Sequence, residues 1–334
     1  MVSKIENEVI ERIAEQRILV FGDIMLDHYV WGDATRISPE APVPVVSVFR
    51  DSHTVGGAAN VARNLRGLGS HVELSGTVGN DDTAKTLRNI LSEDGIEFSE
   101  LWSKNDVRTI LKTRVVVQKQ QLCRIDREDS PFAYAISAEK FEATIAEKIR
   151  KSDAVIVSDY AKGVVDETIW NLIRGCARKE NTFLALDPKP RRHLAFENPD
   201  LLTPNRSEAL ELAGISVGLH DCFPAEAVCK AIWEKYHPVN LVVTLGADGM
   251  LLSKEGKVDT SIPTVAQEVF DVSGAGDTVI STLAAALSAG ANLETAAHIA
   301  NAAAGVVVGK IGTAAITMSE LRNALEGPEQ ASLS

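Results

Sequence analysis

The sequence predicts an α/β fold in three layers: a mostly parallel β-sheet covered by helices on both faces, together with a small β-sheet lid. Two observations support this class. Short apolar runs that end in Asp, Thr or Gly alternate with segments of helical period, as expected when each strand of a parallel sheet is followed by a helix. Two other segments, residues 28–50 and 108–126, interrupt that alternation and read as antiparallel strands. The whole of residues 1–334 is therefore expected to form one domain with a lid.

The individual elements follow from the same patterns. A buried strand is a short apolar run ended by a turn residue, and an amphipathic helix repeats its apolar positions every three to four residues. Ligands of open α/β sheets gather at the carboxyl ends of the strands, so we expect the site there. The predicted strands are 17–21, 154–159, 183–187, 200–204 and 240–246, and the predicted helices include 3–15, 139–151 and 206–214.

The two lid segments have different signals. Pro39, Pro42 and Pro44 exclude a helix from residues 28–50 and are tolerated only in an edge strand or an irregular loop. In residues 108–126, β-branched residues are interleaved with Lys, Arg and Gln, which indicates a sheet with one wet face. Because a lone small sheet is marginally stable in water, we expect a homodimer formed through its apolar residues. These residues lie in 43–49 and 114–117.

Composition and charge exclude several classes of function. The chain has 334 residues, 45% of them hydrophobic, and a formal net charge of −12, which argues against nucleic-acid binding. Its four cysteines have neither the pairing of a disulfide scaffold nor the spacing of a zinc site. The N-terminal segment is charged and has no apolar core, and no run of 18 apolar residues occurs. We expect a cytoplasmic protein with no membrane partner.

The strongest motif is DVSGAGD, residues 271–277, which leads directly into an alanine-rich helix. The backbone amides of Gly274, Ala275 and Gly276 can surround an anion at the positive end of the helix dipole. Asp277 in the same turn can then act as general base for a hydroxyl that attacks a phosphate. The alternative is that Asp277 caps the helix and the glycines allow close packing.

Two earlier motifs suggest a polyol site. Gly56 and Gly57 precede a helix that carries Asn60, whose amide can both donate to and accept from sugar hydroxyls. Asp23 and Asp27 follow the first strand at the expected ligand edge, where carboxylates accept hydrogen bonds from hydroxyls. The alternatives are a tight strand-to-helix turn for the glycines and a solvated turn for the two carboxylates.

Several strand-end groups fit a nucleotide. Asn205 and Glu208 are three residues apart at a strand-to-helix junction and could hold a hydrated magnesium ion, or they could cap the helix. The loops 187–191 and 244–249 add Lys189, Thr244 and Gly246 as candidate nucleotide ligands. The chain lacks GxxxxGK[ST], a GxGxxG after the first strand, and GxSxG.

Taken together, the GG…N, NRSE and DVSGAGD motifs resemble the PfkB/ribokinase family of carbohydrate kinases, from about residue 17 to residue 325. The resemblance implies a ribokinase-like fold, with ATP and Mg²⁺, and in relatives a monovalent cation, used to phosphorylate a sugar hydroxyl. By this resemblance Asp277 is the catalytic base and the turn 274–276 the anion hole. It further makes 205–208 the nucleotide and magnesium segment and Asp27, Gly56, Gly57 and Asn60 the sugar ligands.

Within that family, the segments 22–46, 112–126, 158–164 and 202–208 resemble the kinases that phosphorylate D-glycero-D-manno-heptose 7-phosphate. This implies transfer to the anomeric O1, which gives the 1,7-bisphosphate for ADP-heptose and lipopolysaccharide-core synthesis. The chain looks like the stand-alone kinase form. Arg114 and Lys162 are the candidate cations for the phosphate of the substrate. The alternatives are a kinase for fructose, ribose or ketodeoxygluconate, and a non-catalytic binding protein on the same fold.

Overall fold

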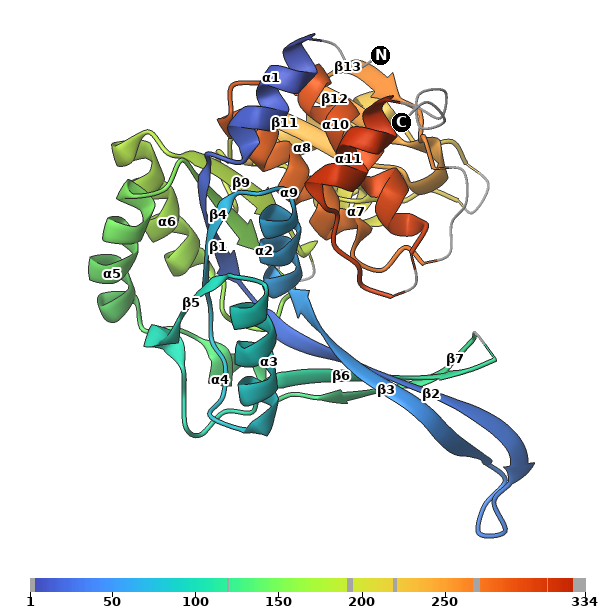
Figure 1. The fold of residues 1–334 in the computed structure, drawn as a ribbon. Helices are drawn as coiled ribbons and strands as arrows, with labels where there is room; N and C mark the ends of the chain where they lie inside the picture. The colour runs from blue at the N-terminus through green and yellow to red at the C-terminus, as the bar shows by residue number, and fades with distance from the viewer. Residues whose placement is uncertain are drawn as a thin grey trace.

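The computed structural model describes residues 4–118, 120–190, 195–218, 221–266, 271–310 and 312–326. Parts of three predicted segments, at positions 3, 119 and 191, lie outside these ranges. The main body contains one nine-stranded sheet between helices (Figure 1). In spatial order its strands are β13 (Lys257–Ile262), β12 (Met250–Lys254), β11 (Asn240–Thr244), β10 (Leu201–Leu202), β9 (Phe183–Asp187), β8 (Ala154–Ser158), β1 (Arg17–Gly22), β4 (His71–Ser75) and β5 (Glu97–Ser99).

The sheet is mostly parallel, as predicted. Every neighbouring pair from β5 to β11 is parallel, and only β12 and β13, at one edge, pair antiparallel. The five predicted strands correspond to β1, β8, β9, β10 and β11. These are the strands with both faces covered, so they are continuous apolar runs that the sequence makes easy to recognise.

Helices cover the two faces of this sheet, and alternate residues of each strand point to opposite layers. In β1, Ile18 and Val20 belong to one hydrophobic cluster, and Leu19 and Phe21 belong to the other. The three-layer architecture is therefore confirmed. The first cluster includes residues of α1 (Lys4–Ile13), α2 (Ala58–Gly67), α3 (Asp82–Glu93), α9 (Ala275–Ser288), α10 (Leu293–Val308) and α11 (Met318–Glu326); the second includes residues of α4 (Pro131–Tyr134), α5 (Ala138–Arg150), α6 (Glu167–Glu180), α7 (Arg206–Ala213) and α8 (Ala225–Tyr236).

Four strands form the second sheet, the lid, which projects from the main body (Figure 1). Its two hairpins are antiparallel, but the inner strands of the hairpins pair in parallel, so the lid is a mixed sheet and not the purely antiparallel one expected. The reason is that both inner strands leave the main body in the same direction (Figure 1). The strand order is β3 (Pro44–Gly57), β2 (Ile24–Ile37), β6 (Ile110–Val117) and β7 (Gln120–Arg127).

The three prolines lie at positions where the lack of a backbone N–H does not interrupt a ladder of the sheet. Pro39 and Pro42 occupy the connection between β2 and β3, and Pro44 is the first residue of β3, an edge strand of the lid. The described chain also contains two short 3₁₀ turns, η1 (Glu100–Trp102) and η3 (Gly246–Asp248).

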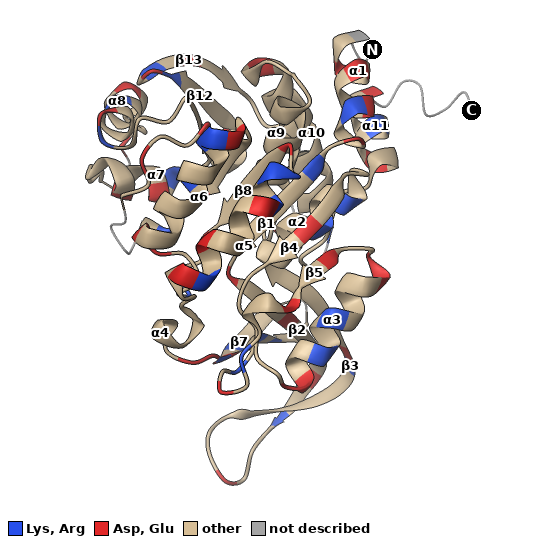
Figure 2. Cartoon of the chain, turned by 90° about the vertical axis from the view of Figure 1, so that its left-hand side faces the viewer, with Lys and Arg blue, Asp and Glu red and all other residues tan. Residues whose placement is uncertain are grey.

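Charge and hydropathy along the helices agree with the composition. Acidic and basic residues are interspersed along α3 and α5 on the side that Figure 2 presents, so these helices offer no continuous basic surface. Within the described ranges, no helix has both the length and the apolar character that crossing a membrane requires.

Candidate active site

Polar residues of the site lie where parallel strands of the main sheet end. Asp23 follows β1, Tyr160 lies two residues after β8, and Asp187 and Thr244 are the last residues of β9 and β11. All these strands run in the same direction, so their carboxyl ends meet at one edge of the sheet. The N-terminus of α9 reaches the same edge, because Asp277 contacts Tyr160.

Asp277 is a buried carboxylate held at both oxygens. Its side chain belongs to the first turn of α9 and is only 3% exposed. Asn60 Nδ2 donates to Oδ2 at 2.6 Å, and the hydroxyl of Tyr160 donates to Oδ1 at 2.6 Å. Burial raises the pKa of Asp277 to about 6, against the opposing effect of these two hydrogen bonds. A carboxylate with this pKa is ionised at neutral pH and is still basic enough to take a proton from a hydroxyl.

The glycine turn before α9 has a conformation that requires glycine. Gly274 has φ of 82°, and a Cβ at this position would lie 2.8 Å from Asn60 Nδ2. The amide of Ala275, predicted to face an anion, donates instead to the carbonyl of Val272 at 3.2 Å. Because the first helical hydrogen bond is the one from Thr278 to Gly274, the amides of Gly276 and Asp277 have no acceptor within the helix. The first-turn amides left without a helical acceptor are therefore those of Gly276 and Asp277, whereas the predicted anion hole comprised the turn 274–276.

Asn60 connects the two motifs and has an unused acceptor. The side chain is fully buried in α2, and its Oδ1 has no hydrogen-bond partner among the described residues. A buried amide oxygen without a partner is costly, and a hydroxyl that entered beside Asp277 would satisfy it. Gly56 and Gly57 lie at the end of β3, just before this helix, and a Cβ at Gly56 would lie 2.6 Å from Asp27 Oδ2.

Asp23, predicted to bind substrate, has another role in the structure. Its carboxylate accepts hydrogen bonds from the backbone amides of Tyr160 (2.8 Å), Lys162 (2.9 Å) and Val164 (3.1 Å), and its side chain is fully buried. The loop 160–164 is therefore fixed onto the end of β1. In the structure the carboxylate of Asp23 thus anchors this loop.

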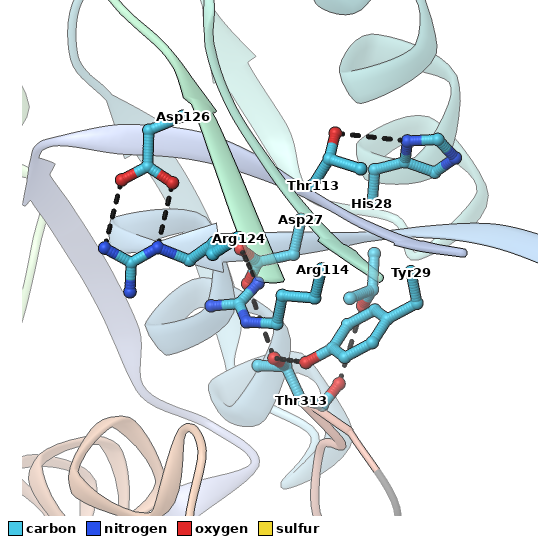
Figure 3. A network of polar contacts seen from close by, with 9 residues as sticks. Asp27, His28, Tyr29, Thr113, Arg114, Arg124, Asp126 and Thr313 are labelled. Carbon is cyan, nitrogen blue, oxygen red and sulfur yellow. Dashed lines mark hydrogen bonds and ion pairs between the residues drawn. The ribbon is translucent and has the colours of Figure 1, made fainter. Parts of the chain in front are cut away.

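Asp27 lies at the base of the lid in a network with Arg114 and Thr313 (Figure 3). Arg114 Nη1 donates to Asp27 Oδ1 at 2.6 Å, and Thr313 Oγ1 donates to Oδ2 at 3.4 Å. Tyr29 shares a further hydrogen bond with Thr313 at 3.2 Å. The guanidinium predicted to hold a phosphate thus already neutralises Asp27, and the hydrogen bonds of Thr313 tie the lid to the segment after α10.

The second predicted cation is also paired. Lys162 Nζ donates to Glu128 Oε1 at 2.7 Å, and both side chains are largely buried. Lys162 lines a cavity of about 530 Å³ together with Tyr160, Lys189, Asn205 and Glu208. This cavity brings the predicted nucleotide segment next to the loop that follows β8.

Tyr160 is the residue that sequence reasoning missed. Burial and the neighbouring Asp277 raise the pKa of its hydroxyl well above the ordinary range, so it stays a neutral donor. Ala161, immediately after it, has φ of 57°, a left-handed conformation that is unusual for alanine and that the backbone bonds to Asp23 stabilise. Its position at the carboxyl end of strand 154–159 was the available signal.

The predicted ligands Thr244 and Gly246 line a second cavity of about 490 Å³. Its walls come from β11, η3, the start of α9 and the middle of α10, and they are mainly apolar. Ala275 and Gly276 line the same cavity, so it opens beside the first turn of α9. The flat base of a nucleotide fits such a space, and the phosphates of that nucleotide could then lie near the amides of the turn.

Asn205 and Glu208 form a capping box at the start of α7, which is the alternative that the sequence left open. Asn205 Oδ1 accepts the amide of Glu208 at 3.0 Å, and Glu208 Oε2 accepts the amide of Asn205 at 2.9 Å. The other Glu208 oxygen accepts a hydrogen bond from Lys189. Although burial opposes it, the carboxylates of Glu208 and Asp187 raise the pKa of Lys189, so it remains an ammonium group.

The donor set around this capping box suits a hydrated cation. Burial and the nearby Glu208 raise the pKa of Asp187, so this carboxyl tends to hold a proton with Lys189 as its cationic neighbour, and a further cation would favour its ionised form. Among the residues the structure describes, no three His, Cys, Asp or Glu side chains could ligate one metal directly. A magnesium ion that keeps its water shell fits these residues, whereas a dedicated protein cage does not.

Comparison with known proteins places this geometry in a family. The model of the "pfkB family carbohydrate kinase" matches residues 15–320. A relative named "Bifunctional protein HldE", from Magnetococcus marinus, is 43% identical over 315 residues, which are 93% of this chain and 64% of that protein. The chain thus spans less than two thirds of that relative.

Solved structures show the same fold. The structure of Arabidopsis thaliana ribokinase complexed with ribose and ATP has a TM-score of 0.72 at 20% identity and covers 94% of this chain and 100% of that one. Escherichia coli phosphofructokinase-2 in complex with potassium has a TM-score of 0.73 at 20% identity and covers 93% and 98%. The fold class predicted from the sequence is confirmed, and the chain belongs to the pfkB family of carbohydrate kinases.

Proposed function

We propose that this enzyme transfers the γ-phosphoryl group of ATP to the anomeric O1 of D-glycero-D-manno-heptose 7-phosphate. The product is the 1,7-bisphosphate, a precursor for ADP-heptose and the lipopolysaccharide core. The observation that carries the kinase part of this proposal is Asp277, a buried carboxylate of pKa about 6 in the first turn of α9. The heptose part rests on the resemblance of the lid segments to heptose 7-phosphate kinases and on the relatives named HldE.

In the proposed reaction Asp277 accepts the proton of the anomeric hydroxyl as that oxygen attacks the γ-phosphorus. The new O–P bond forms while the bond between the γ-phosphorus and the bridging oxygen breaks, and ADP leaves with that electron pair. An anomeric hydroxyl is more acidic than an ordinary alcohol, so a carboxylate is a sufficient base. The reaction otherwise requires positioning and charge stabilisation, which the first-turn amides of Gly276 and Asp277 supply.

The sugar lies between α2 and the lid in this proposal. Asn60 Oδ1 accepts a hydrogen bond from a sugar hydroxyl beside Asp277, since this oxygen is buried and has no other described partner. Asp27 accepts a hydrogen bond from a second sugar hydroxyl. Arg114 and Thr313 each donate one hydrogen bond to Asp27, and each carboxylate oxygen can accept more than one. Tyr160 and Asn60 hold the base in its orientation.

ATP occupies the cavity lined by Thr244 and Gly246, and Lys189 lies towards its phosphates. Asn205 and Glu208 hold Mg²⁺ through water, and the ion would neutralise charge on the phosphates. A monovalent cation is a further ion to test, since the E. coli structure is of a complex with potassium. We place the reaction in the cytoplasm, where ATP is supplied and the four cysteine thiols stay reduced.

A coupled assay of ADP release tests the substrate. It compares heptose 7-phosphate with fructose, ribose and their phosphates at saturating ATP and Mg²⁺. We expect the highest kcat/KM for heptose 7-phosphate. A preference of tenfold or more for a neutral sugar, about 1.4 kcal/mol, would remove the heptose assignment and leave the kinase mechanism standing. The absence of ADP release with every sugar would favour a non-catalytic binding protein.

We also propose a homodimer through the lid. The hairpin of β2 and β3 exposes large apolar side chains, with Val48 57% and Phe49 69% exposed, and the hairpin projects into solvent (Figure 1). Sedimentation at micromolar concentration should give a dimer, and Phe49→Asp should shift it to monomer. Phe132→Asp is the matched control, because Phe132 is 90% exposed on α4 outside the lid. A wild-type monomer would contradict the proposal.

A further inference from the structure

We infer that Lys112 and Lys162 form the subsite for a phosphate monoester at the end of the sugar away from the transferred group. The inference rests on the proposed function, because the acceptor must already carry a phosphate. The sequence pointed to Lys162 for such a phosphate, together with Arg114, and did not point to Lys112. Lys112 lies on β6 of the lid, where it is the register partner of Asp27.

Lys112 has no ion pair of its own in the part of the chain that the structure describes, because its neighbouring carboxylates, Asp27 and Asp126, are paired with other cations. The side chain is half-buried, and its ammonium makes no hydrogen bond or ion pair with a described residue. Burial, followed by the nearby Lys162, lowers its pKa against the opposing effect of Asp126 and Asp27. A half-buried ammonium that repels a second one is unfavourable unless an anion joins them.

The other cations around Lys112 are already neutralised. Arg114 pairs with Asp27, and Lys162 pairs with Glu128. Arg124 makes a two-point contact with Asp126 at 2.8 and 3.1 Å (Figure 3). An incoming anion would therefore contact the ammonium of Lys112, which has no ion pair with a described residue, and the neighbouring ammonium of Lys162, which is paired with Glu128.

The order of residues places this subsite at the correct end of the substrate. From the reacting end, Asp277 contacts Asn60, and Asn60 lies against Gly274, which also approaches Thr313. Thr313 bonds to Asp27, and Asp27 is the register partner of Lys112 across β2 and β6. A sugar whose O1 is at Asp277 and whose hydroxyls meet Asp27 thus directs its far end towards Lys112.

Lys162 approaches the same place from the main body. Its backbone is fixed by Asp23, and it is two residues from Tyr160, which contacts the base. The nucleotide has a different cation, since Lys189 bonds to Glu208 beside the nucleotide segment. A phosphate monoester offers three acceptor oxygens to the two ammonium groups, whereas a sugar carboxylate offers two.

The test compares wild type with Lys112→Met, which removes the charge and retains most of the stem. The measured quantity is the ratio of kcat/KM for heptose 7-phosphate to kcat/KM for the dephosphorylated heptose. We expect this ratio to fall about 10- to 100-fold in Lys112→Met, mainly through KM, and similarly in Lys162→Met. Lys257→Met, which removes an exposed strand lysine of β13, should keep the wild-type ratio.

A binding measurement separates this inference from the proposed function. Isothermal titration without ATP uses heptose 7-phosphate and, as a second probe, fructose 6-phosphate. If wild type does not phosphorylate heptose 7-phosphate but binds either probe in a manner that depends on Lys112, the subsite stands and the acceptor is wrong. If Lys112→Met weakens both the phosphorylated and the neutral sugar equally, or neither, the subsite is overturned whatever the substrate. Failure of both probes to bind wild type overturns it as well.

Discussion

Replacing Asp277 by Asn should remove most of the turnover and at the same time stabilise the fold. The buried carboxylate has a pKa of about 6 against 3.8 in an exposed chain, so its ionisation opposes folding. The difference of about two pKa units corresponds to roughly 3 kcal/mol at pH 7.5. Asparagine keeps the geometry, because its amide can accept from Asn60 and donate to the oxygen of Tyr160. The loss of the base should lower kcat by at least about 10²-fold.

The gain in stability must depend on pH in a particular direction. A carboxyl group whose pKa is raised by folding binds more protons in the folded state, so its favourable contribution is present below about pH 4 and is lost as the pH rises through 6. The variant should thus exceed wild type by roughly 3 kcal/mol at pH 7.5 and by about half of that at pH 5.

Urea unfolding at the two pH values measures this difference. Asp259→Asn, at an exposed position on β13, is the control and should show no such trend. Equal unfolding free energies of Asp277→Asn and wild type at pH 7.5 would refute the reasoning, since they would mean that the ionised carboxylate is not penalised by burial.

Two further variants test how the base is held. Tyr160→Phe removes a hydrogen-bond donor that lowers the pKa of Asp277. The acidic limb of the kcat/KM profile, near pH 6 in wild type, should therefore move to higher pH, with activity partly recovered at pH 8. A lower plateau with an unmoved limb would mean that Tyr160 contributes only packing. Gly274→Ala places a Cβ against Asn60 in a left-handed conformation, so it should destabilise the fold by about 1–2 kcal/mol and lower kcat at least tenfold, measured by urea unfolding and the coupled assay. Gly175→Ala, inside α6 with open space around it, should be neutral or slightly stabilising, and equal behaviour of the two variants would contradict this.

The buried strands were predictable because both of their faces are covered, so they are unbroken apolar runs such as residues 17–21 and 154–159. The antiparallel edge of β12 and β13 and the parallel pairing of β2 with β6 were not. Register between distant strands depends on the direction in which each one leaves the body, and local patterns do not encode that direction.

The site shows the same division. Gly274 and Asp277 belong to one recognisable glycine motif, and Asn60 lies in the helix that follows another. The structure brings Asn60 and Asp277 into contact although they are 217 residues apart in the sequence. Tyr160 was missed because its contact with Asp277 exists only where the end of β8 meets the start of α9.

Ionic partners were the least accessible feature of the site. Arg114 and Lys162 were predicted to hold the substrate phosphate, and nothing in the sequence indicated the carboxylate partner that each has in the fold. Lys112 was detectable in principle, since it precedes Arg114 by two residues on a strand and therefore lies on the same face of the lid.

The most direct test of the central claim is ³¹P NMR of a single-turnover reaction of enzyme, ATP, Mg²⁺ and heptose 7-phosphate. Wild type should convert the γ-phosphate of ATP into a new phosphomonoester on the anomeric carbon, with the 7-phosphate retained and one ADP formed for each bisphosphate. Asp277→Asn should give no such signal in the same time. A phosphoryl group on another hydroxyl, inorganic phosphate in place of the bisphosphate, or full conversion by Asp277→Asn would contradict the account.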